Sequence, residues 1–210
     1  MVKRDEKKGK KMSDFRVLVI LTLGFWLNFS HATVKKTDCL HKRNKICHLI
    51  LKLNDSVENK QAYKLSNIFS KTARKYNLDP KLLVSIAFQE SSFKKDAVRK
   101  VKGLIFDEES GEYKPIAVGA DFCMMQIHMS NIKKMNLDVQ KLLTRPSYCI
   151  EAGAKILSKY KKKHSKKDKI WWTYYNANTI AKRKIYYNKV IRHLDKLGAH
   201  KMRDIASLNK

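Results

Sequence analysis

Residues 80–93 read PKLLVSIAFQESSF, and this stretch decides the fold class. Asp79, directly before it, is a good helix N-cap, and Pro80 suits the first helical position because the N–H that proline lacks has no partner there. Apolar side chains occupy nearly every side of the following turns, which is typical of a helix buried in a core. The stretch therefore predicts a core helix whose far end carries Gln89 and Glu90.

Glu90 is the candidate catalytic residue. A carboxylate at the C-terminal end of a buried helix faces the negative end of the helix dipole, and burial removes its water. Both effects disfavour the charged form and raise the pKa. A carboxylic acid that keeps its proton near neutral pH can protonate a leaving glycosidic oxygen. On this argument alone, however, an exposed structural Glu on the last turn is the better interpretation.

Outward from this helix, the pattern indicates a mainly α (α+β) domain. Apolar residues at three- and four-residue steps predict a helix over 61–76. Further helices are expected near 122–134, from about 148 to 163, near 169–177 and, last, up to Gly198, which suits the residue after a helix end. Residues 99–118 predict a short β-hairpin or flap around Ser110-Gly111, and residues 33–60 are expected to be irregular.

The N-terminus predicts the compartment. Basic residues crowd the first eleven positions, the apolar run Val17–Phe29 follows, and Ser30-His31-Ala32 resembles a cleavage site. This order is typical of a secretory signal peptide over 1–32, so we expect an exported protein, periplasmic or secreted. An uncleaved N-terminal anchor is the alternative, although the run is short for a span of about 20 residues. A start at Met12 would leave a more ordinary leader.

The chain is strongly basic. Its 210 residues include 46 Lys and Arg against 19 Asp and Glu, a formal net charge of +27. Without residues 1–32 it keeps 39 basic and 16 acidic residues, a net +23, so the charge belongs to the mature part. Such a charge favours anionic partners, which include a membrane surface, a wall polymer and nucleic acid.

Export makes the four cysteines candidates for disulfides: Cys39, Cys47, Cys123 and Cys149. Four cysteines allow three pairings, and the sequence alone does not choose among them. The first two lie beside His41 and His48 and could instead bind a metal ion, but their spacing fits no common zinc pattern. We therefore expect no metal and no other cofactor.

Several further groups of residues follow Glu90 in a recognisable order. They are ESSF at 90–93, DFCMMQI at 121–127, PSYCIEAGAKIL at 146–157, YYNAN at 174–178, and Tyr186 with Val190. Together they resemble the lytic transglycosylase family with the goose-type-lysozyme-like domain, and most of all its small periplasmic members that accompany secretion systems. The matching family motifs are E-S-x-F, G-L-M-Q-I, P-x-x-N-I-x-x-G-A-x-I-L and A-Y-N-A-G.

Each fragment alone is weak, whereas four in order at sensible spacing are specific. The resemblance covers roughly residues 61–197. It implies a lysozyme-like domain over 61–200, with a small hairpin or flap and a C-terminal tail over 201–210. The implied substrate is the peptidoglycan glycan strand.

By this resemblance, Glu90 is the sole catalytic carboxylate. The residues implied to bind the sugar around it are Ser91, Met125, Gln126, Tyr175, Asn176 and Tyr186. Amide and phenol groups hydrogen-bond to sugar hydroxyl and acetamido groups, while aromatic rings and Met pack on sugar faces. For Trp171, Trp172 and Tyr174 we prefer plain core packing.

A lone acid implies an unusual mechanism, because most glycosidases use two carboxylates. In the resembling family, the substrate's acetamido group and 6-hydroxyl replace the second one. Glu90 would cleave the MurNAc-GlcNAc β-1,4 bond and leave a 1,6-anhydroMurNAc end. The alternative involves Asp121, which would permit lysozyme-type hydrolysis of the same bond if it faces Glu90 across the cleft.

The sequence departs from the family at three motif positions. Cys123 stands where the family has Gly, and Cys149 where it often has Asn, which suggests a Cys123–Cys149 disulfide and leaves Cys39–Cys47 as the other pair. Closing such a loop could add roughly 3 kcal/mol. Asn178 replaces the last Gly of A-Y-N-A-G, and Asn tolerates a positive φ better than most residues. These changes motivate a second hypothesis, a catalytically weak peptidoglycan-binding assembly factor.

The remaining partners are expectations from charge and family. Lys161–Lys163 and Lys166-Lys167 are expected to be a solvated helix end and loop, or to hold the protein on an anionic wall polymer or membrane surface. We expect no nucleic acid, because no recognition motif accompanies the charge and export argues against it. A secretion or conjugation apparatus, a phage particle and general wall turnover all use this domain.

Overall fold

The computed structural model describes residues 39 and 44–196. The chain divides into two units, 1–36 and 37–210, and every described residue belongs to the second. The predicted leader over 1–32, His41, the helix end at Gly198 and the tail over 201–210 lie outside the described residues. Within the described part, no helix has both the length and the apolar character needed to cross a membrane.

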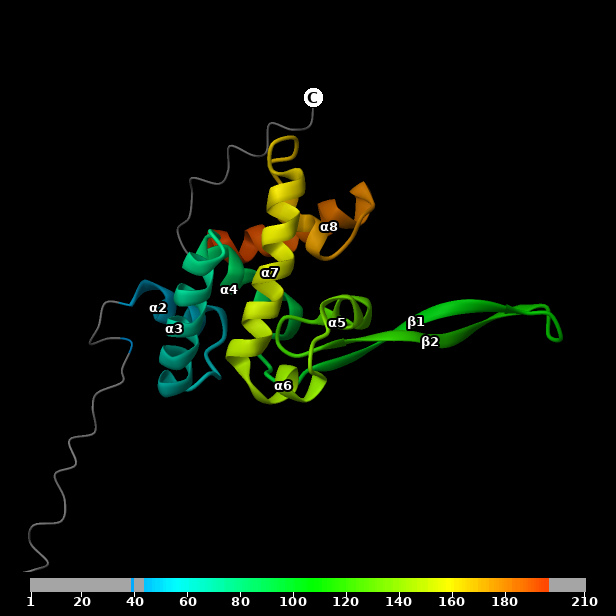
Figure 1. The fold of residues 1–210 in the computed structure, drawn as a ribbon, viewed down its shortest axis with the longest axis horizontal. Coiled ribbons are helices and arrows are strands. Elements are labelled where there is room, and N and C mark those ends of the chain that lie inside the picture. Colours follow the sequence, from blue (N-terminus) through cyan, green and yellow to red (C-terminus); the bar gives the residue numbers. More distant parts are fainter. Residues whose placement is uncertain (1–38, 40–43, 197–210) are drawn as a thin grey trace, which may run out of the picture. The chain divides into compact units, whose positions relative to one another are not determined.

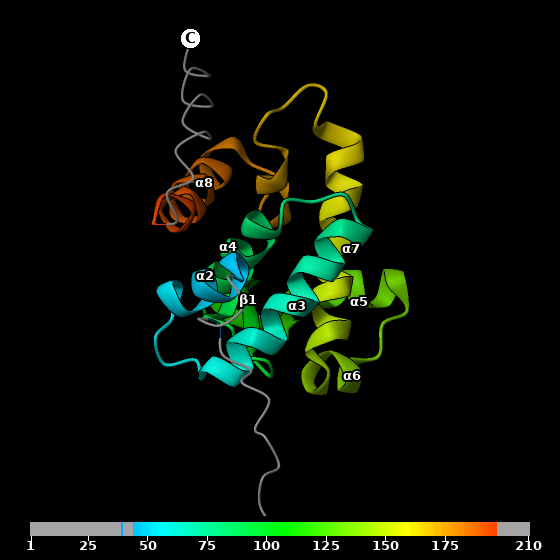
Figure 2. The ribbon, with the colours of Figure 1, turned by 90° about the vertical axis from the view of Figure 1, so that its left-hand side faces the viewer.

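Helix α4 (Pro80–Ser91) is the predicted core helix. The Asp79 side chain accepts a hydrogen bond from the Lys81 N–H at 2.8 Å, and Pro80 occupies the first turn. The helix contacts α2 (Lys45–Leu53), α3 (Asn59–Lys75) and α8 (Ile180–Asp195), and Figure 2 shows it between them. Ser92 ends the helix in the left-handed conformation, with a φ of 54°, so the chain turns away just after Glu90.

The other helices surround this centre. Helix α7 (Pro146–His164) packs against α3 and against the 3-10 helix η2 (Trp171–Tyr175), as seen in Figure 1. Two short helices, α5 (Met129–Met135) and α6 (Val139–Thr144), lie between the sheet and α7 in the sequence. The helices expected over 61–76 and from about 148 are thus confirmed as α3 and α7.

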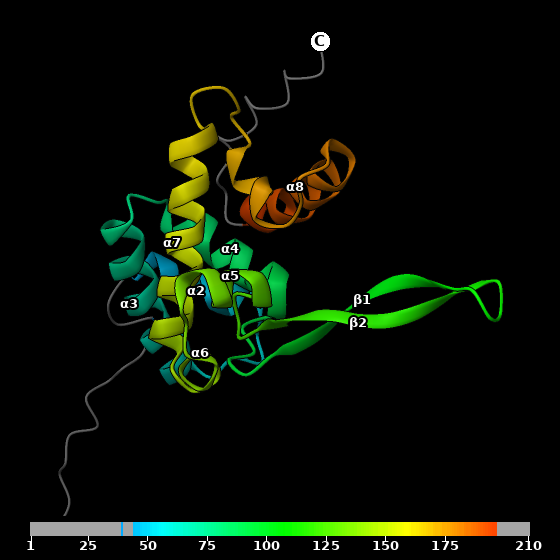
Figure 3. The ribbon, with the colours of Figure 1, turned by 45° about the vertical axis from the view of Figure 1, so that its right-hand side comes forward.

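The predicted hairpin is also confirmed. Strands β1 (Val98–Asp107) and β2 (Glu112–Phe122) pair antiparallel, and β3 (Ile127–His128) adds a short third strand beside β2. A bulge between Val101 and Lys102 interrupts the β1–β2 register. Figure 3 shows the hairpin extending away from the helices, with only its base beside them. The base therefore is the part that can contribute to a site in the helical body.

The expectation of an irregular segment over 33–60 is wrong for residues 45–53. These residues form α2, whose start is capped by the Asn44 side chain through the N–H groups of Ile46 and Cys47. Leu49, Ile50 and Leu53 are buried on its inner side. The charged and polar neighbours hid this helix, which is stabilised by tertiary packing more than by a long local pattern.

The helix expected near 122–134 is replaced by a turn, strand β3 and the short helix α5. Cys123 and Gln126 have φ values of 62° and 49°, which no right-handed helix accommodates. The expected helix near 169–177 is the shorter 3-10 helix η2. The fold class, a mainly α lysozyme-like domain with a small sheet, is nevertheless as predicted.

The structure contains both disulfides that the resemblance suggested. Cys39 is joined to Cys47, and Cys123 to Cys149, so the end of β2 is linked covalently to α7. The first bond uses the two thiols that a metal site at Cys39 and Cys47 would need. Cys123, at the family's glycine position, has the positive φ. Asn178, at the other glycine position, does not have a positive φ, so its turn does not use the tolerance of Asn for that conformation.

Candidate active site

A cleft of about 400 Å³ lies where α4, η2 and the base of the hairpin meet. Its lining includes Glu90, Asp121, Gln126, Tyr175 and Asn176. A second hollow adjoins it, since both share Glu90, Arg99 and Asn176, and it is bordered by Tyr186 and Lys189 of α8. The fold thus gathers residues from four separate motifs around Glu90.

Glu90 has the properties expected of an acid. It lies on the last turn of α4, and its Oε1 accepts a hydrogen bond from the Tyr186 hydroxyl at 2.7 Å. Burial raises the pKa of Glu90 to about 7. The Tyr186 hydrogen bond and the charges of Arg99 and Lys189 lower it, and the charge of Asp121 raises it. Desolvation outweighs the donors and cations, so a large share of Glu90 stays protonated near neutral pH.

Tyr186 is held firmly as the partner of Glu90. It is buried on α8, and its ring lies 6.1 Å from the ring of Trp172. Burial and the neighbouring Glu90 raise the pKa of the Tyr186 phenol well above its usual range. The phenol therefore stays protonated and donates to the carboxylate that forms when Glu90 releases its proton. The buried position of Trp172 confirms core packing for that residue, while Trp171 and Tyr174 are only half-buried.

Asp121 lines the same cleft as Glu90, which is a condition for the alternative reaction, lysozyme-type hydrolysis. It is buried near the end of β2, and its Oδ2 accepts two hydrogen bonds from Arg99, at 2.8 Å from Nη2 and 3.1 Å from Nε. The pairing follows from the hairpin register, in which Arg99 and Asp121 are directly opposite. Unlike Glu90, the second carboxyl of the cleft therefore has a fixed cation partner.

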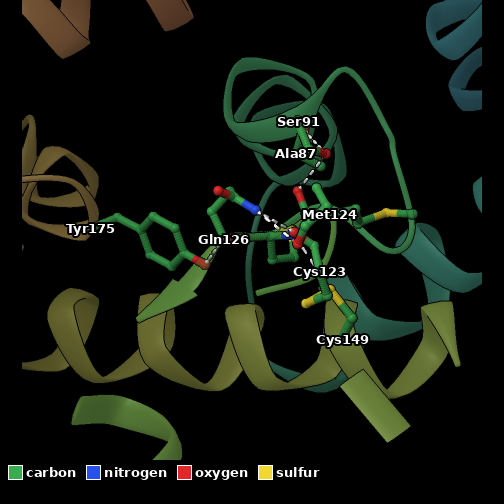
Figure 4. Close-up of a disulfide and its surroundings, with 9 residues drawn as sticks. Ala87, Ser91, Cys123, Met124, Gln126, Cys149 and Tyr175 are labelled. Carbon is green, nitrogen blue, oxygen red and sulfur yellow. Dashed lines mark hydrogen bonds between the residues drawn. A yellow bond between two sulfur atoms is a disulfide. The ribbon is translucent and has the colours of Figure 1, made fainter. Parts of the chain in front are cut away.

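The turn over 123–126 connects the cleft walls through backbone atoms. The Ser91 hydroxyl donates to the Met124 carbonyl at 2.9 Å, and the Tyr175 hydroxyl donates to the Met125 carbonyl at 2.7 Å. From the other side, the Met125 N–H donates to Cys149 Sγ at 3.3 Å. Figure 4 shows this turn between the end of α4, Tyr175 and the disulfide. The turn fixes the sheet side of the cleft relative to Glu90.

Two residues that were predicted to contact the sugar, Met125 and Ser91, do not line the cleft or the adjoining hollow. Met125 is fully buried, and its side chain fills the space left by Gly153 on α7, where a Cβ would approach Met125 Cε to 2.7 Å. Ser91 lies outside the lining of the cleft and uses its hydroxyl on the turn. Both residues hold the turn and α7 in place next to the cleft. The Ser91 hydroxyl is bonded to the turn, and the Met125 side chain packs on Gly153 of α7.

The other predicted residues do line the cleft. Gln126 is buried and donates from Nε2 to the Cys123 carbonyl at 3.0 Å and to the Ala97 carbonyl at 3.3 Å. Its side-chain oxygen remains to accept from a ligand. Tyr175 lines the cleft, and the exposed Asn176 lines both hollows. Amide and phenol groups around one acid form a lining suited to a neutral, hydroxyl-rich ligand.

Sequence reasoning missed the cations of the site. Arg99, Lys182 and Lys189 line the two hollows, and His128 and Asn131 also line the cleft. In a chain with 46 Lys and Arg, no single cation is conspicuous. For Arg99 the usable signal was its place opposite Asp121, which requires the hairpin register.

The arrangement can donate a proton from the half-buried Glu90 carboxyl to a bound sugar strand. The family model of the transglycosylase SLT domain matches residues 67–192, which is more than half of the chain and includes the residues of the cleft. A comparison with curated proteins finds no match. The matched domain and the site at Glu90 lead to one conclusion: the chain belongs to the SLT transglycosylase family and is a lytic transglycosylase that acts on peptidoglycan.

Proposed function

We propose that the protein cleaves the MurNAc-GlcNAc β-1,4 bond with Glu90 as its single acid/base and leaves a 1,6-anhydroMurNAc end. One observation carries the proposal. Of the two carboxyl groups in the described lining of the cleft, Glu90 has no ion pair, a pKa of about 7 and a phenol donor, whereas Asp121 is paired with Arg99. Such an environment equips one carboxyl to give and then take back a proton.

The proposed reaction needs only that group. The Glu90 proton moves to the bridging oxygen, the bond from C1 of MurNAc to this oxygen breaks, and the substrate's acetamido group stabilises the positive charge at C1. Glu90, now a carboxylate held by Tyr186, removes the proton of the 6-hydroxyl, and O6 bonds to C1. The proton returned to Glu90 restores the starting state, and no water is consumed.

Lysozyme-type hydrolysis remains the second candidate, because Asp121 lines the cleft with Glu90. In that mechanism the second carboxylate activates water or attacks the sugar. The Arg99 pair weighs against it, since two hydrogen bonds from Arg99 already occupy Oδ2 of Asp121. The structure thus favours the anhydro product.

Mass spectrometry of the products tests the proposal. Wild-type protein incubated with purified peptidoglycan should release 1,6-anhydro ends, and Glu90→Gln should lower the rate by about 10³-fold or more, the range for loss of a general acid. Glu108→Gln, on the exposed hairpin tip, is the matched control and should leave the rate unchanged. Hydrolysed reducing ends would assign the lysozyme-type reaction instead. Binding without turnover by the oxidised wild type would indicate an assembly factor.

We further propose that the protein is exported and acts at the cell wall. Two disulfides in one small domain support an oxidising compartment. The net charge of +23 on the mature part would hold the protein on an anionic wall polymer or membrane surface. The mass of the mature protein decides the first point, since cleavage after Ala32 gives an N-terminus at Thr33, whereas an anchor keeps the leader.

A further inference from the structure

The exposed apolar side chains of the domain are concentrated on the hairpin. Of the large apolar residues that are exposed in the described part of the chain, six belong to β1 and β2: Val98, Leu104, Phe106, Tyr113, Ile116 and Val118. Leu104 and Tyr113 are 69% and 67% exposed. The rings of Phe106 and Tyr113, which are opposite each other in the register, have their centroids 5.2 Å apart. Apolar groups gathered on an exposed surface mark interaction sites.

The outer part of the hairpin is also acidic. Residues 103–113, which we call the distal hairpin, contain four acidic residues and no basic one, in a chain with a net charge of +27. Asp107 is paired with Lys114, whereas Glu109 and Glu112 have no ion pair among the described residues. Figure 3 shows the distal hairpin away from the helices of its own molecule. It therefore suits a partner that is basic and partly apolar.

Helix α8 presents such a surface. Five exposed residues, spaced by three and four positions, lie along one side of the helix and its C-cap: Lys182, Ile185, Lys189, Arg192 and Lys196. We call these residues the α8 face. Among the ion pairs of the described residues, none involves its four cations. Ile185, between the cations, is 59% exposed.

Other basic segments lack this combination. The end of α7 and the loop after it are basic over 161–167, but no large apolar residue is exposed there in the described part of the chain. The lengths of the two surfaces also agree. At about 3.3 Å per strand residue and 1.5 Å per helix residue, the hairpin from Gly103 to Ser110 and the α8 face from Lys182 to Lys196 both measure roughly 20 Å. The two surfaces are therefore complementary in charge, apolar character and length.

We propose that the distal hairpin of one molecule docks on the α8 face of a second molecule. Each molecule carries both surfaces, so two molecules related by a two-fold axis make the contact twice and form a closed dimer. Leu104 and Tyr113 would cover Ile185 of the partner molecule, and Glu109 and Glu112 would pair with the cations of its α8 face. The inference goes beyond the proposed function, since association does not depend on which product the enzyme forms.

Docking would also affect the catalytic cleft. Lys182, Ile185 and Lys189 border the hollow that contains Glu90 and adjoins the cleft. A hairpin on the α8 face would cover this hollow, so a glycan strand and the second molecule would compete for the surface beside Glu90. The dimer would therefore be a less active form that dissociates on dilution.

Analytical ultracentrifugation of the full chain tests the association. At low salt we expect dimers with a Kd on the order of 10 µM, the strength of a small transient interface, and at high salt at least about tenfold weaker association. Specific activity should fall about twofold as the protein concentration rises through the Kd, because half of the molecules are then paired. In dilute assays the contact is not formed.

Two sets of charge reversals locate the contact. Glu109→Lys with Glu112→Lys reverses the distal hairpin, and Lys182→Glu with Arg192→Glu and Lys196→Glu reverses the α8 face. Each variant alone should remain monomeric, because both of its surfaces then have the same sign of charge. As the matched control, Lys162→Glu with Lys166→Glu, at exposed positions at and just beyond the end of α7, should not weaken association.

An equimolar mixture of the two reversed variants gives the decisive measurement. In the mixture, the basic hairpin of one variant meets the acidic α8 face of the other, and the two unreversed surfaces also meet, so dimers should return. Their return also shows that both variants are folded. Three results would overturn the inference: a wild type that is monomeric at all concentrations, dimers of either reversed variant alone, or a mixture that stays monomeric. Sedimentation needs no turnover, so failure of the proposed reaction is recognised separately.

Discussion

The two walls of the cleft each present one carboxyl group, and their surroundings differ. The helical wall carries Glu90 on α4, desolvated, without an ion pair and bonded to the Tyr186 phenol. The sheet wall carries Asp121 on β2, buried but bonded twice to Arg99 of the neighbouring strand. The first environment raises the pKa of its carboxyl to about 7, whereas the second gives its carboxyl a cation as partner. The comparison shows that the neighbours of a carboxyl group, more than its residue type, decide whether it can act as an acid.

The largest expected effect is on the free energy of unfolding, and it measures the cost of ionising Glu90 on the helical wall. The pKa of Glu90 is raised from 4.5 to about 7, so the native state binds this proton more tightly than the unfolded chain does. The resulting stabilisation is complete below about pH 4.5 and is lost as the pH rises through 7. At pH 9, Glu90→Gln should therefore be more stable than the wild type by about 3 kcal/mol, and below pH 4.5 the two should be similar.

Urea unfolding at both pH values measures this difference. Gln keeps the shape and an acceptor oxygen for Tyr186, so the comparison isolates the charge. Equal stabilities at pH 9 would mean that Glu90 ionises without cost and that the two walls do not differ as described.

The next effect concerns the turn that holds the walls together. Removing the Cys123–Cys149 disulfide by Cys123→Ala with Cys149→Ala should cost about 3 kcal/mol. Cys123→Gly with Cys149→Ala should cost about 1 kcal/mol less, because Cys123 has a φ of 62° that glycine adopts freely. Thermal unfolding of the two double variants measures the gap. A less stable glycine variant would show that the left-handed conformation is not maintained without the disulfide.

A smaller effect is expected when the sheet wall loses its cation. Arg99→Gln leaves the buried Asp121 without its ion pair, at a cost of about 1–3 kcal/mol in unfolding free energy. Asp121 can then accept a proton from water, so a fraction of hydrolysed ends should appear among the anhydro products. Lys102→Gln, farther along β1, is the control. Mass spectrometry that finds only anhydro ends with Arg99→Gln would remove Asp121 from the chemistry altogether.

The smallest expected effect is a shift of the pH profile when the Tyr186 hydroxyl is removed from the helical wall. Tyr186→Phe removes the 2.7 Å hydrogen bond that favours ionised Glu90, so the pKa of Glu90 should rise further. Because the first step needs protonated Glu90, activity falls as the pH rises above this pKa, and the alkaline limb of the pH profile should move upward from about 7. Tyr187→Phe, its neighbour on α8, should leave the limb in place. A downward shift would contradict the assigned direction of the hydrogen bond.

Local patterns were sufficient for part of the molecule. The cap at Asp79, Pro80 and the apolar turns after them predicted the start of α4 and the position of Glu90 on its last turn, and the segments on either side of Ser110-Gly111 predicted the hairpin. The order of the motifs placed Gln126, Tyr175, Asn176 and Tyr186 around Glu90, and all four line the cleft or its adjoining hollow. These features depend on residues close in sequence, or on a family pattern, and so can be predicted without coordinates.

Other features depend on contacts between distant segments. Helix α2 is stabilised by packing its apolar side on the core, and its short pattern did not stand out. Ser91 and Met125 belong to motifs but do not line the cleft: the Ser91 hydroxyl donates to the Met124 carbonyl, and the Met125 side chain is buried. A sequence motif predicts which residue lies near the site but not which way its side chain points.

The sequence alone determined the position of the acid, at the end of an apolar helix, because helix capping and burial patterns are local. The tertiary structure decided what surrounds that acid. Arg99 is nine residues from Glu90 and Tyr186 is 96 residues away, and only the hairpin register and the packing of α8 on α4 bring their charge and phenol to the cleft. Electrostatic fields act through space and not along the chain, so the pKa of Glu90 is a property of the fold.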